Sequence, residues 1–150
     1  MKHITLPIRF GLVTTACLIA YFLILGIFNL NTNPMFSIFN GVITGFGIYE
    51  TINYTKLKND KDFNYTIGFQ NGLITGFIAS ILFTIFFVVY ATEIDPKFIN
   101  KLLTVFSSDY NVHIGLVAFV VAVMGVTTTI VMTLTCMQFL KKSNNITQKA

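Results

Sequence analysis

The sequence has few of the side chains that carry chemistry. Its 150 residues include two histidines, two cysteines and six acidic residues, and charged side chains make up only 11% of the chain. His3 and His113 each lack a second histidine or carboxylate at metal-ligand spacing, so no metal site is predicted. The sequence also has no glycine-rich phosphate loop and no nucleophile elbow. We therefore expect neither enzymatic activity nor a cofactor.

Charged side chains are scarce because the chain is unusually apolar. Hydrophobic residues make up 54% of it, and its mean hydropathy is +0.72. Soluble globular proteins carry about a quarter charged residues, so this composition indicates a membrane protein. A helix needs about 20 apolar residues to cross a hydrocarbon core about 30 Å thick. Four stretches meet this requirement, at about 8–30, 35–54, 67–91 and 113–140.

These stretches predict an all-α fold, an integral membrane bundle of four transmembrane helices in a single domain, 1–150. Lys2 and Arg9 precede the first stretch, as basic residues precede the apolar part of a signal peptide. The apolar run nevertheless continues through CLIAYFLILGIF without a small-residue cleavage site. We therefore expect an uncleaved first helix.

The basic residues predict the orientation of the bundle, because Lys and Arg accumulate in cytoplasmic loops near the ends of membrane helices. Eight of the ten lie near the amino end, between the second and third stretches, or after the fourth. The other two are Lys97 and Lys101. Both termini are thus expected in the cytoplasm, with a flexible tail at about 142–150. We assign the net charge of +4 to topology and to anionic lipid headgroups, and expect no nucleic-acid partner.

The two cysteines fit the same topology. Cys17 and Cys136 both fall in the cytoplasmic halves of their predicted helices. Because these positions lie within lipid and near a reducing compartment, we expect two buried small apolar side chains rather than a disulfide.

One segment between the third and fourth spans predicts a short amphipathic helix at about 96–107. Asp95 stands where a helix N-cap belongs, and Pro96 at the favoured first helical position. Phe98, Leu102 and Phe106 then follow at helical spacing. We expect this helix to lie in the outer membrane interface with its apolar face down. The three residues are candidates for docking a partner, and the alternative is a cap packed over the bundle.

A short phrase occurs twice, as NGVITGF at 40–46 and as NGLITGF at 71–77. Each copy carries two glycines four residues apart, a pattern that lets membrane helices approach closely. We expect the second and third helices to cross as a tight antiparallel hairpin through these glycines, Gly41, Gly45, Gly72 and Gly76. The alternative is an inverted repeat of the kind that builds transporters around a site at the membrane midplane.

Polar side chains inside the predicted spans are the remaining candidates for function. Glu50 lies about 24 Å along its helix from Pro34, within about a turn of the cytoplasmic interface, where it can reach water. Asn40 and Asn71 begin the two copies of the repeated phrase. We expect the asparagines and the threonines of the fourth span to serve as packing contacts. Asn40, Asn71 and Glu50 are also the candidate residues of a polar cavity.

Two sequence blocks resemble a known family. IGFQNGLITGFIAS at 67–80 and IDPKFINKLL at 94–103 are similar to the most recognisable part of domain of unknown function 4199. The resemblance implies a bacterial integral membrane protein of the Bacteroidetes group, with four helices and a place in the inner membrane. It implies no activity and no catalytic residues.

Two classes of function fit these observations. The first is an accessory or scaffold subunit of a membrane complex, which needs a stable bundle and a membrane-protein partner or self-association, but no chemistry. The alternative is a small oligomeric transporter or channel that uses Glu50 and the hairpin of Asn40 and Asn71. A Glu50→Gln substitution separates the two, because it abolishes proton-coupled transport and leaves a scaffold assembled.

Overall fold

The computed structural model describes residues 5–58, 63–105 and 113–140, and these residues form helices and contain no strand. The all-α architecture expected from the sequence is therefore confirmed for this part of the chain. In chain order the elements are α1 (Thr5–Ile27), α2 (Pro34–Lys58), α3 (Tyr65–Val89), the π-helical turn η1 (Tyr90–Ile94), α4 (Phe98–Val105) and α5 (Ile114–Leu140).

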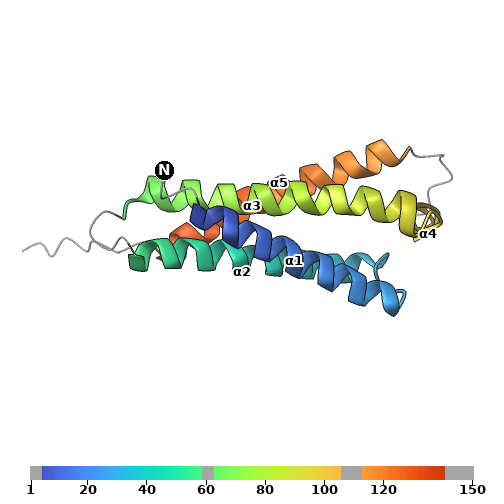
Figure 1. Ribbon diagram of the computed structural model, residues 1–150, viewed down its shortest axis with the longest axis horizontal. Coiled ribbons are helices and arrows are strands. Elements are labelled where there is room, and N and C mark those ends of the chain that lie inside the picture. The colour runs from blue at the N-terminus through green and yellow to red at the C-terminus, as the bar shows by residue number, and fades with distance from the viewer. Residues whose placement is uncertain (1–4, 59–62, 106–112, 141–150) are drawn as a thin grey trace, which may run out of the picture.

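The four long helices lie lengthwise beside one another, and α4 closes one end of the bundle (Figure 1). α2 and α3 pack against each other, and each also packs against both α1 and α5. The start of α1 and the end of α5 lie toward the same end of the bundle (Figure 1). We call this the terminal end, and the opposite end, which holds α4, the α4 end.

Asparagine side chains set the starts of two helices. Asn33 Oδ1 accepts a hydrogen bond from the backbone N–H of Met35 at 3.0 Å, where α2 begins. Asn64 Oδ1 accepts one from Ile67 N at 2.9 Å, where α3 begins. These bonds satisfy N–H groups that have no partner within the helix. The turn between α1 and α2 contains Asn29 in the left-handed region, with φ of 55°, a conformation that asparagine tolerates well.

Three of the long helices are long and apolar enough to cross a membrane: Thr5–Ile27, Tyr65–Ile94 and Ile114–Leu140. α2 has 25 residues but is less apolar than these three. Asn40 and Glu50 lie within it and lower its hydropathy. The helices also depart from the expected bounds by a few residues, most clearly at α2, which continues to Lys58 instead of ending near 54.

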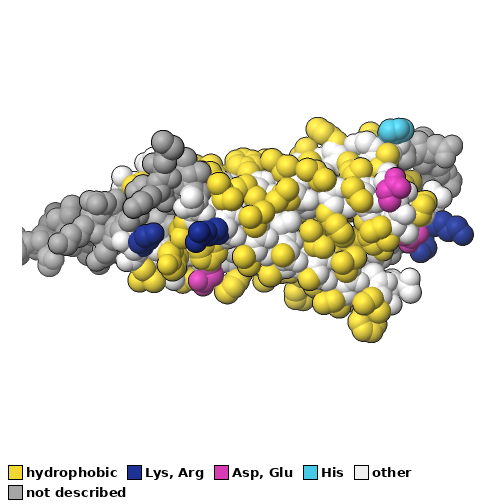
Figure 2. Space-filling view, in the orientation of Figure 1, with side chains coloured by type: hydrophobic (Ala, Val, Ile, Leu, Met, Phe, Trp, Pro, Cys, Tyr) yellow, Lys and Arg dark blue, Asp and Glu magenta, His cyan; other side chains and the backbone are white. Residues whose placement is uncertain are grey.

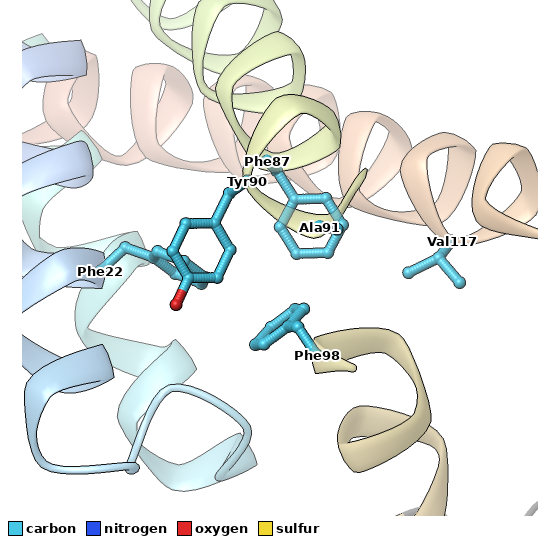
Figure 3. Close-up of a cluster of buried hydrophobic side chains, with 6 residues drawn as sticks. All are labelled: Phe22, Phe87, Tyr90, Ala91, Phe98 and Val117. Carbon is cyan, nitrogen blue, oxygen red and sulfur yellow. The ribbon is translucent and has the colours of Figure 1, made fainter. Parts of the chain in front are cut away.

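The aromatic cluster forms the core at the α4 end, and consists of Phe22, Phe87, Tyr90, Ala91, Phe98 and Val117 (Figure 3). Phe22 of α1 lies at its centre, with the rings of Tyr90 and Phe98 edge-on to it at centroid distances of 5.0 and 5.7 Å. Edge-to-face pairs at such distances are favourable beyond the area they bury. A smaller core of Ile48, Ile52, Cys136 and Met137 joins α2 to α5 nearer the terminal end.

α4 packs onto the aromatic cluster. It begins at Phe98, two residues later than expected, because Pro96 and Lys97 form a turn. Asp95 still accepts the Lys97 N–H, at 3.2 Å, and its carboxylate pairs with Lys101 at 3.1 Å. The alternative of a cap packed over the bundle thus describes α4 as it stands in this structure.

Candidate functional site

A ladder of small residues joins α3 to α5. Every fourth residue of α3 meets every fourth residue of α5 in antiparallel order, and we call this set the α3–α5 ladder. Its rungs are Gly68 with Met137, Gly72 with Thr133, Gly76 with Thr129, and Ser80 with Gly125. A Cβ atom added to Gly72 would lie only 2.7 Å from Thr133 Cγ2. Glycine is needed there because the side chain of the facing helix fills the space that a methyl group would take.

The repeated phrase therefore has a different role from the one expected. The glycines of both copies meet side chains of α5 and not each other, although Gly72 also lies against Ile52 of α2. In the first copy, a Cβ on Gly45 would lie 3.1 Å from Met132 Sδ, and one on Gly41 would lie 3.8 Å from Thr128 Cγ2. The expected crossing of α2 and α3 through these glycines is wrong, because the glycine faces are rotated toward α5. The two copies form the two walls against which α5 packs.

Polar side chains join α2 to α3 where glycines were expected. Asn71 Nδ2 donates a hydrogen bond to Thr55 Oγ1 at 3.1 Å, and the Thr75 hydroxyl lies 3.1 Å from that of Thr51. Thr75 Oγ1 also lies 3.2 Å from the carbonyl of Pro7, which brings in α1. Each of the four side chains is at most 8% exposed. We call Thr51, Thr55, Asn71 and Thr75 the polar seam.

Most threonines in the bundle also bond to their own helix. The hydroxyl donates to the carbonyl four residues earlier at 2.7 to 3.0 Å in Thr14, Thr15, Thr51, Thr55, Thr84, Thr92, Thr127, Thr129 and Thr135. Such bonds let a hydroxyl remain in an apolar environment without a partner on another helix. Of the fourth-span threonines expected to act in packing, Thr129 and Thr133 are buried against α3, whereas Thr127 and Thr135 are exposed.

The candidate cavity residues lie apart. Asn71 pairs with Thr55, and Asn40 lies 15 residues before Thr55 on α2, or about 22 Å along the helix. One cavity lined by both asparagines is therefore contradicted, since antiparallel helices carry the two copies to opposite halves of the bundle. Glu50 is half-buried and precedes Thr51 of the polar seam. Asn40 Oδ1 is buried without a hydrogen-bond partner, as is Thr133 Oγ1.

With this geometry in place, comparison with known proteins gives one result. Residues 9–111 match DUF4199, which is described as a protein of unknown function. The chain belongs to this family. No curated protein and no solved structure matches it. The resemblance noted in the two sequence blocks is thereby confirmed.

The DUF4199 match divides the α3–α5 ladder. It covers α2 and α3, with both copies of the repeated phrase, and it ends three residues before α5 begins at Ile114. The glycine walls thus belong to the matched region, and the helix that packs against them follows it.

The docking residues expected on α4 are placed differently in this DUF4199 member. Phe98 is 1% exposed and points into the aromatic cluster (Figure 3). Leu102 is half-buried and packs against the same cluster, and Phe106 lies outside the described residues. A partner cannot reach the Phe98 ring while α4 stays in place, because the chain's own α1 and α3 already cover it.

The cysteines are only partly as expected. Both thiols are free, and Cys136 is buried with its sulfur 3.7 Å from the Gly45 carbonyl oxygen. Cys17 is exposed on α1, which corrects the expectation of two buried side chains. It lies on the face of α1 that turns away from α2 and α3. Within residues 5–58, 63–105 and 113–140, no three histidine, cysteine or acidic side chains come close enough to hold a metal ion.

Sequence reasoning missed two features of this site. Residues 68, 72, 76 and 80 of α3 are all small, and so are residues 125, 129 and 133 of α5. This matched four-residue spacing was a readable signal for the ladder. The second feature is a hydrogen bond from Lys56 Nζ to the carbonyl of Leu140, 2.9 Å long, which caps the end of α5. No sequence pattern pairs residues 84 positions apart.

Proposed function

We propose that this DUF4199 protein crosses the bacterial inner membrane four times, with both termini in the cytoplasm. α2 is the one of these four helices that is less apolar than the others, so its crossing needs separate support. Its 25 residues reach about 38 Å, which is enough for the hydrocarbon core. It also packs alongside three helices that are each long and apolar enough to cross. Figure 2 supports this arrangement: hydrophobic side chains cover the middle of the visible face, and charged ones lie toward its ends.

The orientation follows from the positive charges. The described basic residues at the terminal end are Arg9, Lys56 and Lys58, and the sequence before, between and after these helices adds more. At the α4 end, Lys97 and Lys101 are accompanied by Glu93 and Asp95. The excess of Lys and Arg at the terminal end assigns it to the cytoplasm.

We further propose a non-catalytic role as an accessory or scaffold subunit of a membrane complex. The observation that carries it is how most interior polar groups are used: the polar seam bonds α2 to α3, and Ser80 Oγ and Thr129 Oγ1 of the α3–α5 ladder lie 3.3 Å apart. The outer surface presents large apolar side chains on every long helix, among them Leu12, Phe46, Ile85 and Phe119. Such a surface suits lipid and a neighbouring membrane protein or a second copy. Its chemistry does not suit nucleic acid.

Purification tests this role. The tagged protein, expressed at its native level, is extracted in mild detergent, and the mass and composition of the eluted particle are measured. We expect a second protein in fixed stoichiometry, or a defined homo-oligomer. A monomer that elutes alone, while its fold remains intact by circular dichroism, would contradict the scaffold role.

A transporter is the second candidate, and one observation favours it. Asn40 Oδ1 is a buried acceptor without a partner, and such groups are costly inside a membrane unless something uses them. If Asn40 and Glu50 serve transport, Asn40→Leu and Glu50→Gln should abolish solute flux in proteoliposomes and leave the bundle assembled. For a scaffold, both variants should retain the partner or the oligomer seen with the unmodified chain.

A further inference from the structure

The start of α1 and the last turns of α2 form one surface at the terminal end. α1 and α2 are antiparallel, and their register is fixed by the ring contact of Phe10 with Tyr54, 6.0 Å between centroids. Arg9 is exposed and directly precedes Phe10. Lys58 is exposed one helical turn beyond Tyr54, which is itself 49% exposed. Arg9, Tyr54 and Lys58 therefore share one region of the surface.

The charge of this region is basic. Lys56 lies between Tyr54 and Lys58 on α2, but its ammonium group is occupied by the Leu140 carbonyl. Within the part of the chain that the structure describes, Glu50, one turn before Tyr54, is the acidic residue nearby, and it is half-buried; in the sequence Asp60 and Asp62 follow Lys58 and lie outside that part. Among the described residues, the exposed charges that remain here are the guanidinium of Arg9 and the ammonium of Lys58.

The depth of this surface matches a lipid headgroup. Arg9 lies 18 residues before the end of α1 at Ile27, or about 27 Å along the helix, close to the thickness of the hydrocarbon core. With the α4 end of α1 at one boundary of the hydrocarbon, Arg9 lies at the other. Tyrosine is enriched at this depth, and arginine and lysine there bind the phosphates of anionic lipids.

We propose that Arg9, Tyr54 and Lys58 form a binding site for the headgroup of an anionic phospholipid in the cytoplasmic leaflet. The two cations contact the phosphate and the acidic or hydroxylated headgroup, and the Tyr54 ring packs against the glycerol region. Charge complementarity and depth select this ligand, because a zwitterionic headgroup brings a cation of its own toward Arg9 and Lys58. The site rests on the proposed membrane embedding and is independent of the scaffold role.

The test uses the full chain in mild non-ionic detergent, with phosphatidylglycerol or phosphatidylcholine added in increasing mole fraction and thermal unfolding as the readout. We expect phosphatidylglycerol, but not phosphatidylcholine, to raise the melting temperature. In R9Q/K58Q, the mole fraction that gives half of this rise should increase about 30-fold, since each basic residue at a membrane surface contributes about fivefold in affinity.

K97Q/K101Q is the matched control, because it removes the same charge at the α4 end and should leave the response unchanged. R9K/K58R keeps the charge and should retain most of the response, which separates binding from any failure of R9Q/K58Q to fold. An undiminished response in R9Q/K58Q would overturn the proposal, and so would equal loss in the control. An equal rise with inorganic phosphate would also overturn it, since the ligand would then be phosphate and not a lipid.

Extraction of membranes with alkaline carbonate distinguishes a failure of this site from a failure of the proposed embedding. We expect the protein to stay in the membrane pellet for all three variants. Release of the unmodified chain would refute the embedding itself, and the site with it. Retention together with an unaltered lipid response in R9Q/K58Q refutes the headgroup site alone.

Discussion

Gly72→Ala tests the α3–α5 ladder with a single methyl group. The added Cβ would lie 2.7 Å from Thr133 Cγ2, whereas carbon atoms in contact are about 3.5–4.0 Å apart, so the Thr133 side chain or α5 itself must move by about 1 Å. Overpacking of this kind costs about 1–3 kcal/mol, and the preference of a helix for alanine over glycine returns about 1 kcal/mol. We expect a net loss of up to about 2 kcal/mol.

Gly41→Ala is the matched control, because Gly41 holds the same place in the first copy of the repeated phrase. The nearest atom to its added Cβ is Thr128 Cγ2 at 3.8 Å, an ordinary contact. Alanine there should be neutral or stabilise the chain by up to about 1 kcal/mol. The two substitutions thus have opposite expected signs within nearly identical sequences.

Thr133→Ala should rescue Gly72→Ala. It removes Cγ2 and Oγ1, the two Thr133 atoms that the added methyl would meet at 2.7 and 3.2 Å. Thr133 Oγ1 is buried without a partner, so its loss breaks no hydrogen bond. The double-mutant cycle should give a coupling of about 1–2 kcal/mol, typical of residues in contact.

The assay is unfolding by sodium dodecyl sulfate in mixed micelles, followed by far-ultraviolet circular dichroism, for the unmodified chain, the three single variants and the double variant. Equal stability of Gly72→Ala and Gly41→Ala would refute the ladder. A cycle whose effects simply add would show that the strain at Gly72 does not come from Thr133.

Further substitutions test the rest of the core by the same assay. Phe98→Ala should cost about 3–5 kcal/mol, because it removes a ring of the aromatic cluster that is only 1% exposed. Phe139→Ala, at a position that is 81% exposed, should change stability by less than about 0.5 kcal/mol. Similar effects at both positions would contradict the packing of α4. Asn71→Leu removes the hydrogen bond to Thr55 and should cost about 0.6–2 kcal/mol, an effect that should largely vanish when Thr55 is already valine.

The helices could be predicted from composition and spacing alone. In lipid, the backbone N–H and C=O groups of a run of about 20 apolar residues can hydrogen-bond only to one another. Each such run therefore becomes a helix, whichever neighbours it packs against. The amphipathic spacing that begins at Phe98 similarly predicted α4, which the structure places at Phe98–Val105. The antiparallel arrangement of α2 and α3 was predicted as well, from the hairpin expected of the second and third helices.

Rotation of the helices was decided only by the tertiary structure. Glycines four residues apart mark a face that a neighbouring helix can approach, but they do not say which neighbour. The glycines of both copies were expected to meet each other, and they meet α5, because threonine and methionine side chains of α5 fill the spaces that the glycines leave. Threonine and asparagine side chains form the contact between α2 and α3 instead. Their hydroxyl and amide groups find hydrogen-bond partners there.

The same distinction separates what the sequence says of the candidate sites from what the fold adds. Local spacing determined that Phe98 lies on the apolar face of a short helix. Only the packing of α1 against α3 determined that this face covers an aromatic cluster and leaves the Phe98 ring no room for a partner. Asn40 and Asn71 begin nearly identical phrases, yet antiparallel helices carry them to opposite halves of the bundle. Sequence determines which side chains share a helix face, and the contacts between helices decide what that face meets.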